Sequence, residues 1–209
     1  MVLDECRPLW AGVERADSIV LNPHKWLGAI FDCSLYLVRD PEHLVRVMST
    51  NPAYLQSTAA GAVTTYRDWG IALGRRFRAL KLWTLIHLEG VDAIRARIRR
   101  DLEHARWLAG AVAGTPGWRV VAPVPLQTVC VRHEPTRADG KVLDGEALDA
   151  HTRAWCDRVN ASGVAYLTAA VLDGRWMVRV AMGAPTTERR HVEETWRAMQ
   201  DAATQGSAA

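Results

Sequence analysis

The sequence predicts a layered α/β fold, and three observations lead to this prediction. Short apolar runs typical of strands, such as residues 18–21 and 34–38, alternate with longer helical patterns. Two long helical patterns follow one another over residues 71–113. The pair Asp173-Gly174, placed between two apolar runs, is a β-hairpin signal. Strands crossed by a few helices of this kind form a layered α/β domain.

The first part of the chain is expected to hold a short helix or turn over residues 8–12 and a buried strand that ends at Asn22. Residues 34–38 predict its partner strand. A helix over residues 41–48 would begin with proline at its first position. Residues 49–66 are rich in Ser, Thr, Ala and Gly with little periodicity, which predicts a long mobile loop, and such loops are usually functional.

Two helices are predicted next. The pattern over residues 71–88 is apolar nearly all round, so this helix should be largely buried, and Gly90 should end it. The pattern over residues 91–113 interleaves arginines with apolar residues. Acidic residues lie among those arginines, so a solvated helix face is favoured over a polyanion or nucleic-acid site at Arg95 to Arg100.

From residue 117 onward the sequence predicts a small α+β domain. Its last helix is expected to begin after Pro185-Thr186-Thr187, with a threonine N-cap followed by Glu188, and to run to about residue 203. Its other elements are strands over 118–121, 128–132, 164–168 and 176–181 and a helix over 143–162 that ends at Gly163. The chain would thus divide into segments 1–66, 67–116 and 117–205.

Composition narrows the function classes. The chain has 209 residues, 49% hydrophobic and 23% charged, with a net charge of only +3, which is typical of a soluble globular protein and does not favour nucleic-acid binding. Its four cysteines lack metal-ligand or paired spacing, which disfavours a metal site or a disulfide framework and favours the cytoplasm. Neither a signal peptide nor a membrane span is predicted.

The segment with chemical potential is Asn22-Pro23-His24-Lys25-Trp26, directly after the first predicted strand. A lysine at a rigid strand end, partly buried and near a cation, would have a lowered ammonium pKa and a larger fraction of free amine for attack on a carbonyl. By itself the pentapeptide could also be a turn with a solvated lysine.

This pentapeptide, with Ala16-Asp17-Ser18 before it and Phe31-Asp32-Cys33-Ser34 after it, resembles the lysine segment of the pyridoxal-phosphate-dependent group II decarboxylases, the aromatic-L-amino-acid decarboxylase family. The resemblance continues through Asn51-Pro52-Ala53-Tyr54-Leu55, Asp68-Trp69 and residues 73–83 to the C-terminal domain. It implies the C-terminal part of a fold-type I PLP-dependent transferase: the end of the cofactor-binding large domain, connecting helices and the small C-terminal domain.

The resemblance also implies site residues. Lys25 would bind the aldehyde of pyridoxal 5'-phosphate covalently. Asn22 and His24 would contact its phosphate, for which an amide and an imidazole are suitable donors; the alternatives are a turn residue and a packed histidine. Tyr54, on the predicted loop, would protonate the substrate carbon after carbon dioxide leaves, while loop closure expels water. The alternative is an aromatic side chain that anchors the loop.

Further implications concern the substrate. Arg179 matches an arginine that faces the active site and places the substrate or the loop, with a structural salt bridge as the alternative; Arg67 and Arg75 are expected to be structural. Trp26 and the Phe-Asp-Cys-Ser segment are similar to the aromatic amino-acid branch, and a tyrosine rather than a phenylalanine at position 54 favours simple decarboxylation over oxidative deamination. The expected products are an amine and carbon dioxide, from a cytoplasmic homodimer.

Three family elements lie upstream of the lysine in the resembled enzymes: an aspartate at the pyridine nitrogen, a histidine stacked on the ring, and a Ser/Thr/Gly turn for the phosphate. The chain is therefore expected to be the C-terminal part of a decarboxylase, to leave sheet edges and an apolar face uncovered, and to bind the cofactor weakly by itself. The alternative is a catalytically inactive fragment, or a partner subunit, that lacks the N-terminal half of the cofactor site.

Overall fold

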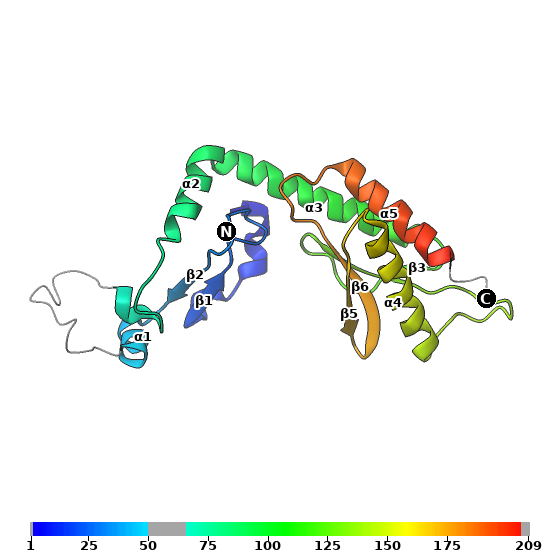
Figure 1. Cartoon of the computed structure of the whole chain (residues 1–209), viewed down its shortest axis with the longest axis horizontal. Coiled ribbons are helices and arrows are strands. Elements are labelled where there is room, and N and C mark those ends of the chain that lie inside the picture. Colours follow the sequence, from blue (N-terminus) through cyan, green and yellow to red (C-terminus); the bar gives the residue numbers. More distant parts are fainter. Residues whose placement is uncertain (1, 50–65, 206–209) are drawn as a thin grey trace, which may run out of the picture. The chain divides into compact units, whose positions relative to one another are not determined.

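The computed structural model describes residues 2–49 and 66–205 (Figure 1). The chain divides into two compact units, Met1–Arg95 and Ala96–Ala209, which are called here the N-terminal and C-terminal units. Helix α3, Val91–Ala113, contains the boundary between them and has the predicted bounds. The predicted segment boundaries near residues 66 and 116 stay a prediction.

The N-terminal unit begins with two 3-10 helices, η1 (Asp4–Trp10) and η2 (Val13–Arg15), followed by strands β1 (Ser18–Leu21) and β2 (Leu35–Val38). The strands pair antiparallel, with Ser18 opposite Val38 and Leu21 opposite Leu35, which confirms the predicted pair. The predicted burial of β1 is wrong: Val20 is 59% exposed. A two-stranded sheet needs covering layers to bury an apolar strand, and the described residues leave much of this one uncovered.

Helix α1 (Pro41–Met48) has the predicted bounds and the predicted proline at its first position. The side chain of Asp40 accepts a hydrogen bond of 3.0 Å from the backbone N–H of His43, and proline follows at the first helical position. Leu44 is the buried residue of this helix. A short 3-10 helix, η4 (Tyr66–Trp69), comes next among the described residues, so most of the predicted 49–66 loop lies outside them.

Helix α2 (Ala79–Glu89) differs from its prediction in start and burial. Residues 71–78 are not helical, and two glycines, Gly70 and Gly74, precede the helix, where they disfavour helical backbone. None of its residues is buried, and Trp83 is 58% exposed. The described residues cover the apolar surface that suggested burial only in part, since Leu82 and Leu85 are half-buried. Gly90, with φ 77°, ends the helix as predicted.

The arginine-rich part of α3 also needs a correction. Arg99 is exposed, but Arg97 and Asp101 are buried, so the face is not wholly solvated. Burial of charged side chains is tolerated when they have partners, and both Arg97 and Asp101 interact with other groups.

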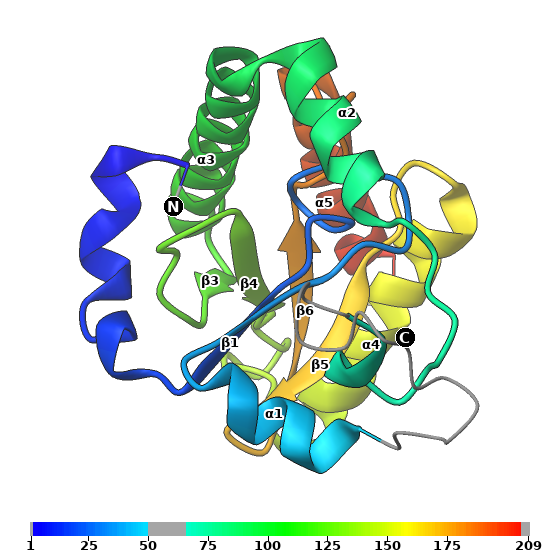
Figure 2. The ribbon, with the colours of Figure 1, turned by 90° about the vertical axis from the view of Figure 1, so that its left-hand side faces the viewer.

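The C-terminal unit contains a four-stranded antiparallel sheet in the order β3-β4-β6-β5. Figure 2 shows this sheet with α3 and the helices α4 and α5 beside it. The elements are β3 (Trp118–Val120), β4 (Thr128–His133), α4 (Gly145–Ser162), β5 (Thr168–Leu172), β6 (Arg175–Ala181) and α5 (Arg189–Thr204).

Two details of this unit differ from the predictions. The strand expected over residues 164–168 is β5, which begins at Thr168, because the two-residue turn Asp173-Gly174 requires the strand to continue up to Leu172. Helix α5 is capped by Glu188 rather than by a threonine. The Glu188 side chain bonds to the backbone of His191, and the His191 ring accepts from the Glu188 N–H at 3.1 Å.

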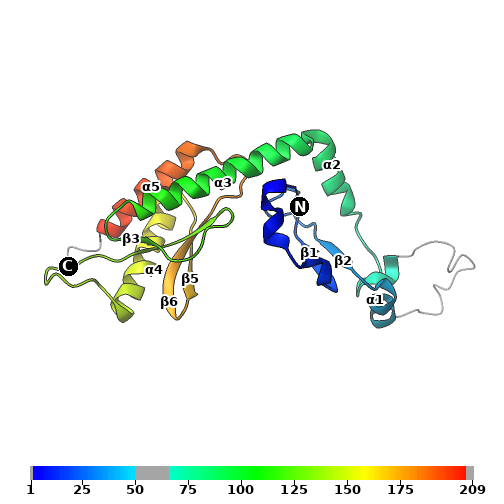
Figure 3. The same ribbon diagram turned by 180° about the vertical axis from the view of Figure 1, so that it is seen from behind.

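The helices cover one face of this sheet (Figure 3). Val129, Val131, Val178 and Val180 point to that face and form the core with Leu108, Trp155 and Met199. Since side chains alternate along a strand, the opposite face carries Cys130 and Arg179, which are register partners. Within residues 2–49 and 66–205, no helix combines the length and apolar character needed to cross a membrane.

Candidate active site

The predicted cofactor lysine lies in the connection between β1 and β2, residues 22–34, called here the lysine loop. Its backbone folds on itself: the N–H of Lys25 donates to the carbonyl of Asn22 at 2.9 Å, and that of Ala29 donates to the carbonyl of Pro23 at 2.9 Å. Gly28 has φ 87°, a left-handed conformation that favours glycine. These bonds give the loop a defined conformation around Lys25.

The two ends of the lysine loop are joined by side chains. Ser34 donates its hydroxyl to Oδ1 of Asn22 at 2.6 Å. The ring Nδ1 of His24 lies 2.6 Å from the carbonyl oxygen and 3.1 Å from the N–H of Cys33, and the ring packs edge-on against Phe31. The structure thus brings Asn22, His24 and Lys25 together in one loop.

Lys25 itself is exposed, which corrects the predicted partial burial. No hydrogen bond or ion pair joins its Nζ to another residue of the described ranges, 2–49 and 66–205. The residues in those ranges leave this amine uncovered. The lysine amine is therefore sterically available for covalent chemistry with a carbonyl.

Asp32 is a part of the site that the sequence reasoning missed. It lies within the lysine loop, and three cations surround its carboxylate: Arg76 Nη2 at 3.2 Å, Arg78 Nε at 3.0 Å and Lys81 Nζ at 3.7 Å. Burial acts to raise the pKa of Asp32, but a backbone hydrogen bond and the positive charges of Arg78 and Arg76 hold it below its ordinary value.

A signal for this cluster is present in the sequence. Arg75, Arg76, Arg78 and Lys81 follow one another with no acidic residue between them, so the segment needs an anion from elsewhere in the chain. Asp32 is the acid in the resemblance motif Phe31-Asp32-Cys33-Ser34. Long-range pairing of this kind cannot be read from local periodicity.

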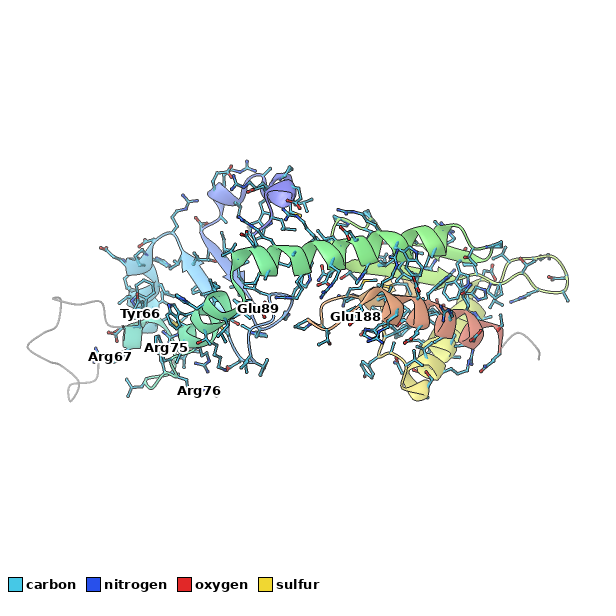
Figure 4. All side chains as sticks on the ribbon, turned by 90° about the horizontal axis from the view of Figure 1, so that it is seen from above. Tyr66, Arg67, Arg75, Arg76, Glu89 and Glu188 are labelled. Atoms are coloured by element: carbon cyan, nitrogen blue, oxygen red, sulfur yellow. The ribbon has the colours of Figure 1, made fainter. Side chains whose placement is uncertain are left out.

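The base of the predicted loop is held by further polar contacts (Figure 4). Arg75 donates to the carbonyl of Tyr66 at 3.0 Å, and Arg67 forms an ion pair with Asp68 at 3.1 Å. The hydrogen bond from Arg67, with its charge and a bond from Ser49, holds the pKa of Asp68 below its ordinary value against the effect of burial. These contacts agree with the structural roles expected for Arg67 and Arg75.

The other two predicted site residues are not part of the lysine loop. Tyr54 lies outside the described residues. Arg179 belongs to the C-terminal unit, on the sheet face opposite the helices, and its side chain is exposed. It makes no hydrogen bond or ion pair with the residues that the structure describes, so the structural salt bridge weighed as its alternative is absent from those ranges.

Comparisons with known proteins bear on the whole chain. Residues 1–134 match the family described as pyridoxal-dependent decarboxylase conserved domain. Tryptophan decarboxylase 2 of Oryza sativa subsp. japonica is 40% identical over 198 residues, 92% of this chain and 38% of that protein. Phenylacetaldehyde synthase of Arabidopsis thaliana is 38% identical over 204 residues, 97% of this chain and 41% of that protein.

Solved structures agree with the sequence comparisons. The crystal structure of Oryza sativa TDC with PLP and tryptamine superposes with a TM-score of 0.89 at 35% identity, over 97% of this chain and 42% of that one. The chain spans about two fifths of the length of the curated relatives that it matches. The predicted fold class is confirmed by this superposition, and the family match over residues 1–134 shows that the chain belongs to the pyridoxal-dependent decarboxylase family.

Proposed function

We propose that this chain provides the lysine-bearing part of an enzyme that decarboxylates an aromatic L-amino acid to the amine and carbon dioxide. The observation that carries the proposal is the exposed side chain of Lys25, which has no ion-pair or hydrogen-bond partner among the described residues. It lies in a loop whose ends are joined by Asn22–Ser34 and His24–Cys33 contacts. Bound pyridoxal phosphate supplies the electron sink for loss of carbon dioxide.

The residues of the lysine loop suit this cofactor chemically. Lys25 presents an amine that would hold the cofactor through its aldehyde. Asn22 uses its carbonyl oxygen for Ser34, which leaves its amide N–H groups as donors to a phosphate oxygen. In the tautomer with its proton on Nε2, His24 accepts a hydrogen bond from the Cys33 N–H at Nδ1, and Nε2 can donate to the same phosphate.

Two further residues are assigned to the proposed site. Tyr54 would deliver a proton to the substrate carbon after decarboxylation. Arg179 would orient the substrate or the loop that carries Tyr54. Its guanidinium has no partner among the described residues and can form a bidentate ion pair with a carboxylate. Both assignments rest on the resemblance of these positions to the group II decarboxylases.

The substrate class rests on the relatives and on Trp26. Tryptophan decarboxylase 2 is named for an aromatic substrate and phenylacetaldehyde synthase for an aromatic aldehyde product. Tyr54 favours the amine over the aldehyde as the product of this chain. We also propose a homodimer of the complete enzyme and a cytoplasmic location, the latter supported by four free cysteines.

A non-catalytic role is the second candidate, as an inactive fragment or as a partner of a separate polypeptide that completes the cofactor site. It is favoured by the apolar surface of α2, in which no residue is buried, and by the exposed strand β1. A large exposed apolar surface marks a region that normally packs against another polypeptide segment.

The sequence contains only three lysines, Lys25, Lys81 and Lys141, which makes a trapping experiment decisive. The purified chain is mixed with pyridoxal phosphate, reduced with borohydride, and digested for peptide mass spectrometry. The proposal expects the adduct on Lys25, and loss of the visible absorbance band in Lys25→Ala but not in Lys141→Ala. Equal labelling of Lys25 and the exposed Lys141 would mean that the chain does not form a cofactor site by itself.

A further inference from the structure

The cation cluster around Asp32 links two distant segments of the N-terminal unit. Arg76 and Arg78 each bind one carboxylate oxygen, at 3.2 and 3.0 Å. Lys81 donates to the backbone carbonyls of Phe31 and Asp32, at 3.0 and 3.2 Å. The segment that leads into α2 and the first turn of that helix therefore bind both the side chain of Asp32 and the main chain of the lysine loop beside it.

A short series of contacts connects Asp32 to Lys25. Asp32 is bonded to Cys33, whose N–H and carbonyl both face His24, and His24 is bonded to Lys25. The buried thiol of Cys33 lies 3.6 Å from the carbonyl of Arg78, a second link between the same two segments. A substitution at Asp32 would thus alter the position of Lys25 through the Cys33–His24 contact, without any contact between Asp32 and the cofactor.

We propose that Asp32 is a positioning residue, which holds the lysine loop in the conformation that Lys25 needs to bind pyridoxal phosphate; this inference rests on the proposed function of Lys25. A reactive group that is already in place avoids the entropic cost of ordering its loop on binding. Without the carboxylate, the three cations would repel one another and release the loop.

A purely structural role for the cluster makes a different prediction. If the ion pairs only stabilise the N-terminal unit, replacing Asp32 lowers the unfolding temperature and leaves the folded loop unchanged. A positioning role requires that the loop become mobile while the unit stays folded. Hydrogen exchange of the loop amides separates the two, because it measures local opening in the folded protein.

The test compares the wild-type chain with Asp32→Asn, which keeps the size of the side chain but removes its charge. The amides of Lys25, Gly28, Ala29 and Cys33 donate hydrogen bonds in the loop. We expect their exchange to become roughly tenfold faster and the affinity for pyridoxal phosphate to fall by about the same factor, since several ion-pair contacts of a network are lost together. Asp32→Glu should restore part of both.

Two other variants keep the test interpretable. Asp17→Asn is the matched control, because Asp17 also pairs with an arginine, Arg39 at 3.6 Å, but is 98% exposed and lies outside the lysine loop. It should change neither quantity. Arg76→Gln removes the most exposed of the three cations, so this variant should fold normally and show a smaller increase in loop exchange and a smaller loss of cofactor affinity.

The outcomes distinguish this inference from the proposed function. Unchanged loop exchange in a folded Asp32→Asn variant overturns the inference, whatever the cofactor does. Faster exchange and weaker cofactor binding in Asp32→Asn, together with cofactor trapping on Lys25 in the wild type, support both; faster exchange with unchanged cofactor affinity overturns the positioning role. Faster exchange with no specific trapping on Lys25 in the wild type supports the control of the loop by Asp32 and means that the chain does not form a cofactor site by itself.

Discussion

His133 and His151 are joined by a hydrogen bond of 2.9 Å between Nδ1 of the first ring and Nε2 of the second. His133 ends β4 and is buried, and its ring also packs against Trp118. One nitrogen must donate and the other accept, so this contact requires a neutral ring on at least one side. Burial, with the nearby charge of His151, lowers the pKa of His133 to about 4. Burial and Arg158 also lower the pKa of His151.

The C-terminal unit should therefore lose stability as the pH falls from about 6.5 to about 4. Unfolded His133 binds a proton near pH 6.5, whereas the folded residue resists until about pH 4, so unfolding takes up a proton in this window. The expected loss is about 2 kcal/mol, which thermal unfolding at a series of pH values would measure. His133→Gln should flatten this dependence, whereas the exposed His43→Gln should not; equal slopes in both would contradict the assignment.

Replacing Trp118 by alanine should destabilise the C-terminal unit by about 3–5 kcal/mol. Trp118 lies at the centre of an aromatic cluster, with ring centroids 5.3 Å from Trp155 and 4.9 Å from Trp196. Urea unfolding followed by circular dichroism measures the change. Trp83→Ala, at a site 58% exposed, is the control and should alter the stability of that unit by less than about 0.5 kcal/mol.

Alanine at the β5–β6 turn should be unfavourable for backbone reasons alone. Gly174 has φ 74°, and a Cβ there would meet no atom within 4 Å, so Gly174→Ala should cost about 1 kcal/mol through left-handed strain. Gly110, inside α3 and equally free of neighbours, is the opposite case: Gly110→Ala should stabilise by up to about 1 kcal/mol. Thermal unfolding of the two variants should thus move in opposite directions, and a parallel shift would refute this explanation.

The apolar side chains of α2 should drive association of the purified chain. Trp83 and Leu88 are 58% and 81% exposed, which is unusual for such large side chains on one short helix. The double variant Trp83→Ser/Leu88→Ser should shift sedimentation velocity profiles toward the monomer. Val142→Ser, at a site 53% exposed in the C-terminal unit, should leave them as in the wild type. Unaltered association in the double variant would exclude α2 as the surface responsible.

Elements with local signals were predictable from the sequence. Helix α1 has its predicted bounds because Asp40 and Pro41 determine the start within two residues. The Asp173-Gly174 turn was identified for the same reason, although β5 was placed too early, since the apolar run at residues 164–168 obscured the constraint that the turn imposes on the strand. Local chemistry thus determines where elements begin and end.

Properties that depend on the surroundings were not predictable in this way. An apolar helix such as α2 is buried only if other segments cover it, and its sequence does not say which segments do. The exposure of Lys25 likewise depends on which segments cover the lysine loop, and the local sequence does not specify them. In the site, the family motif identified the lysine loop, but the contact of Asp32 with Arg76 and Arg78 joins residues more than forty positions apart. Only the folded arrangement reveals it.

The distribution of cysteines offers a way to follow each unit separately without any substitution. The N-terminal unit contains the part-exposed Cys6 and the buried Cys33, and the C-terminal unit contains the part-exposed Cys130 and the buried Cys156. A buried thiol reacts with an alkylating reagent only when its surroundings open. The alkylation rates of Cys33 and Cys156 therefore report the opening free energies of the two units independently, with Cys6 and Cys130 as internal references for reagent access.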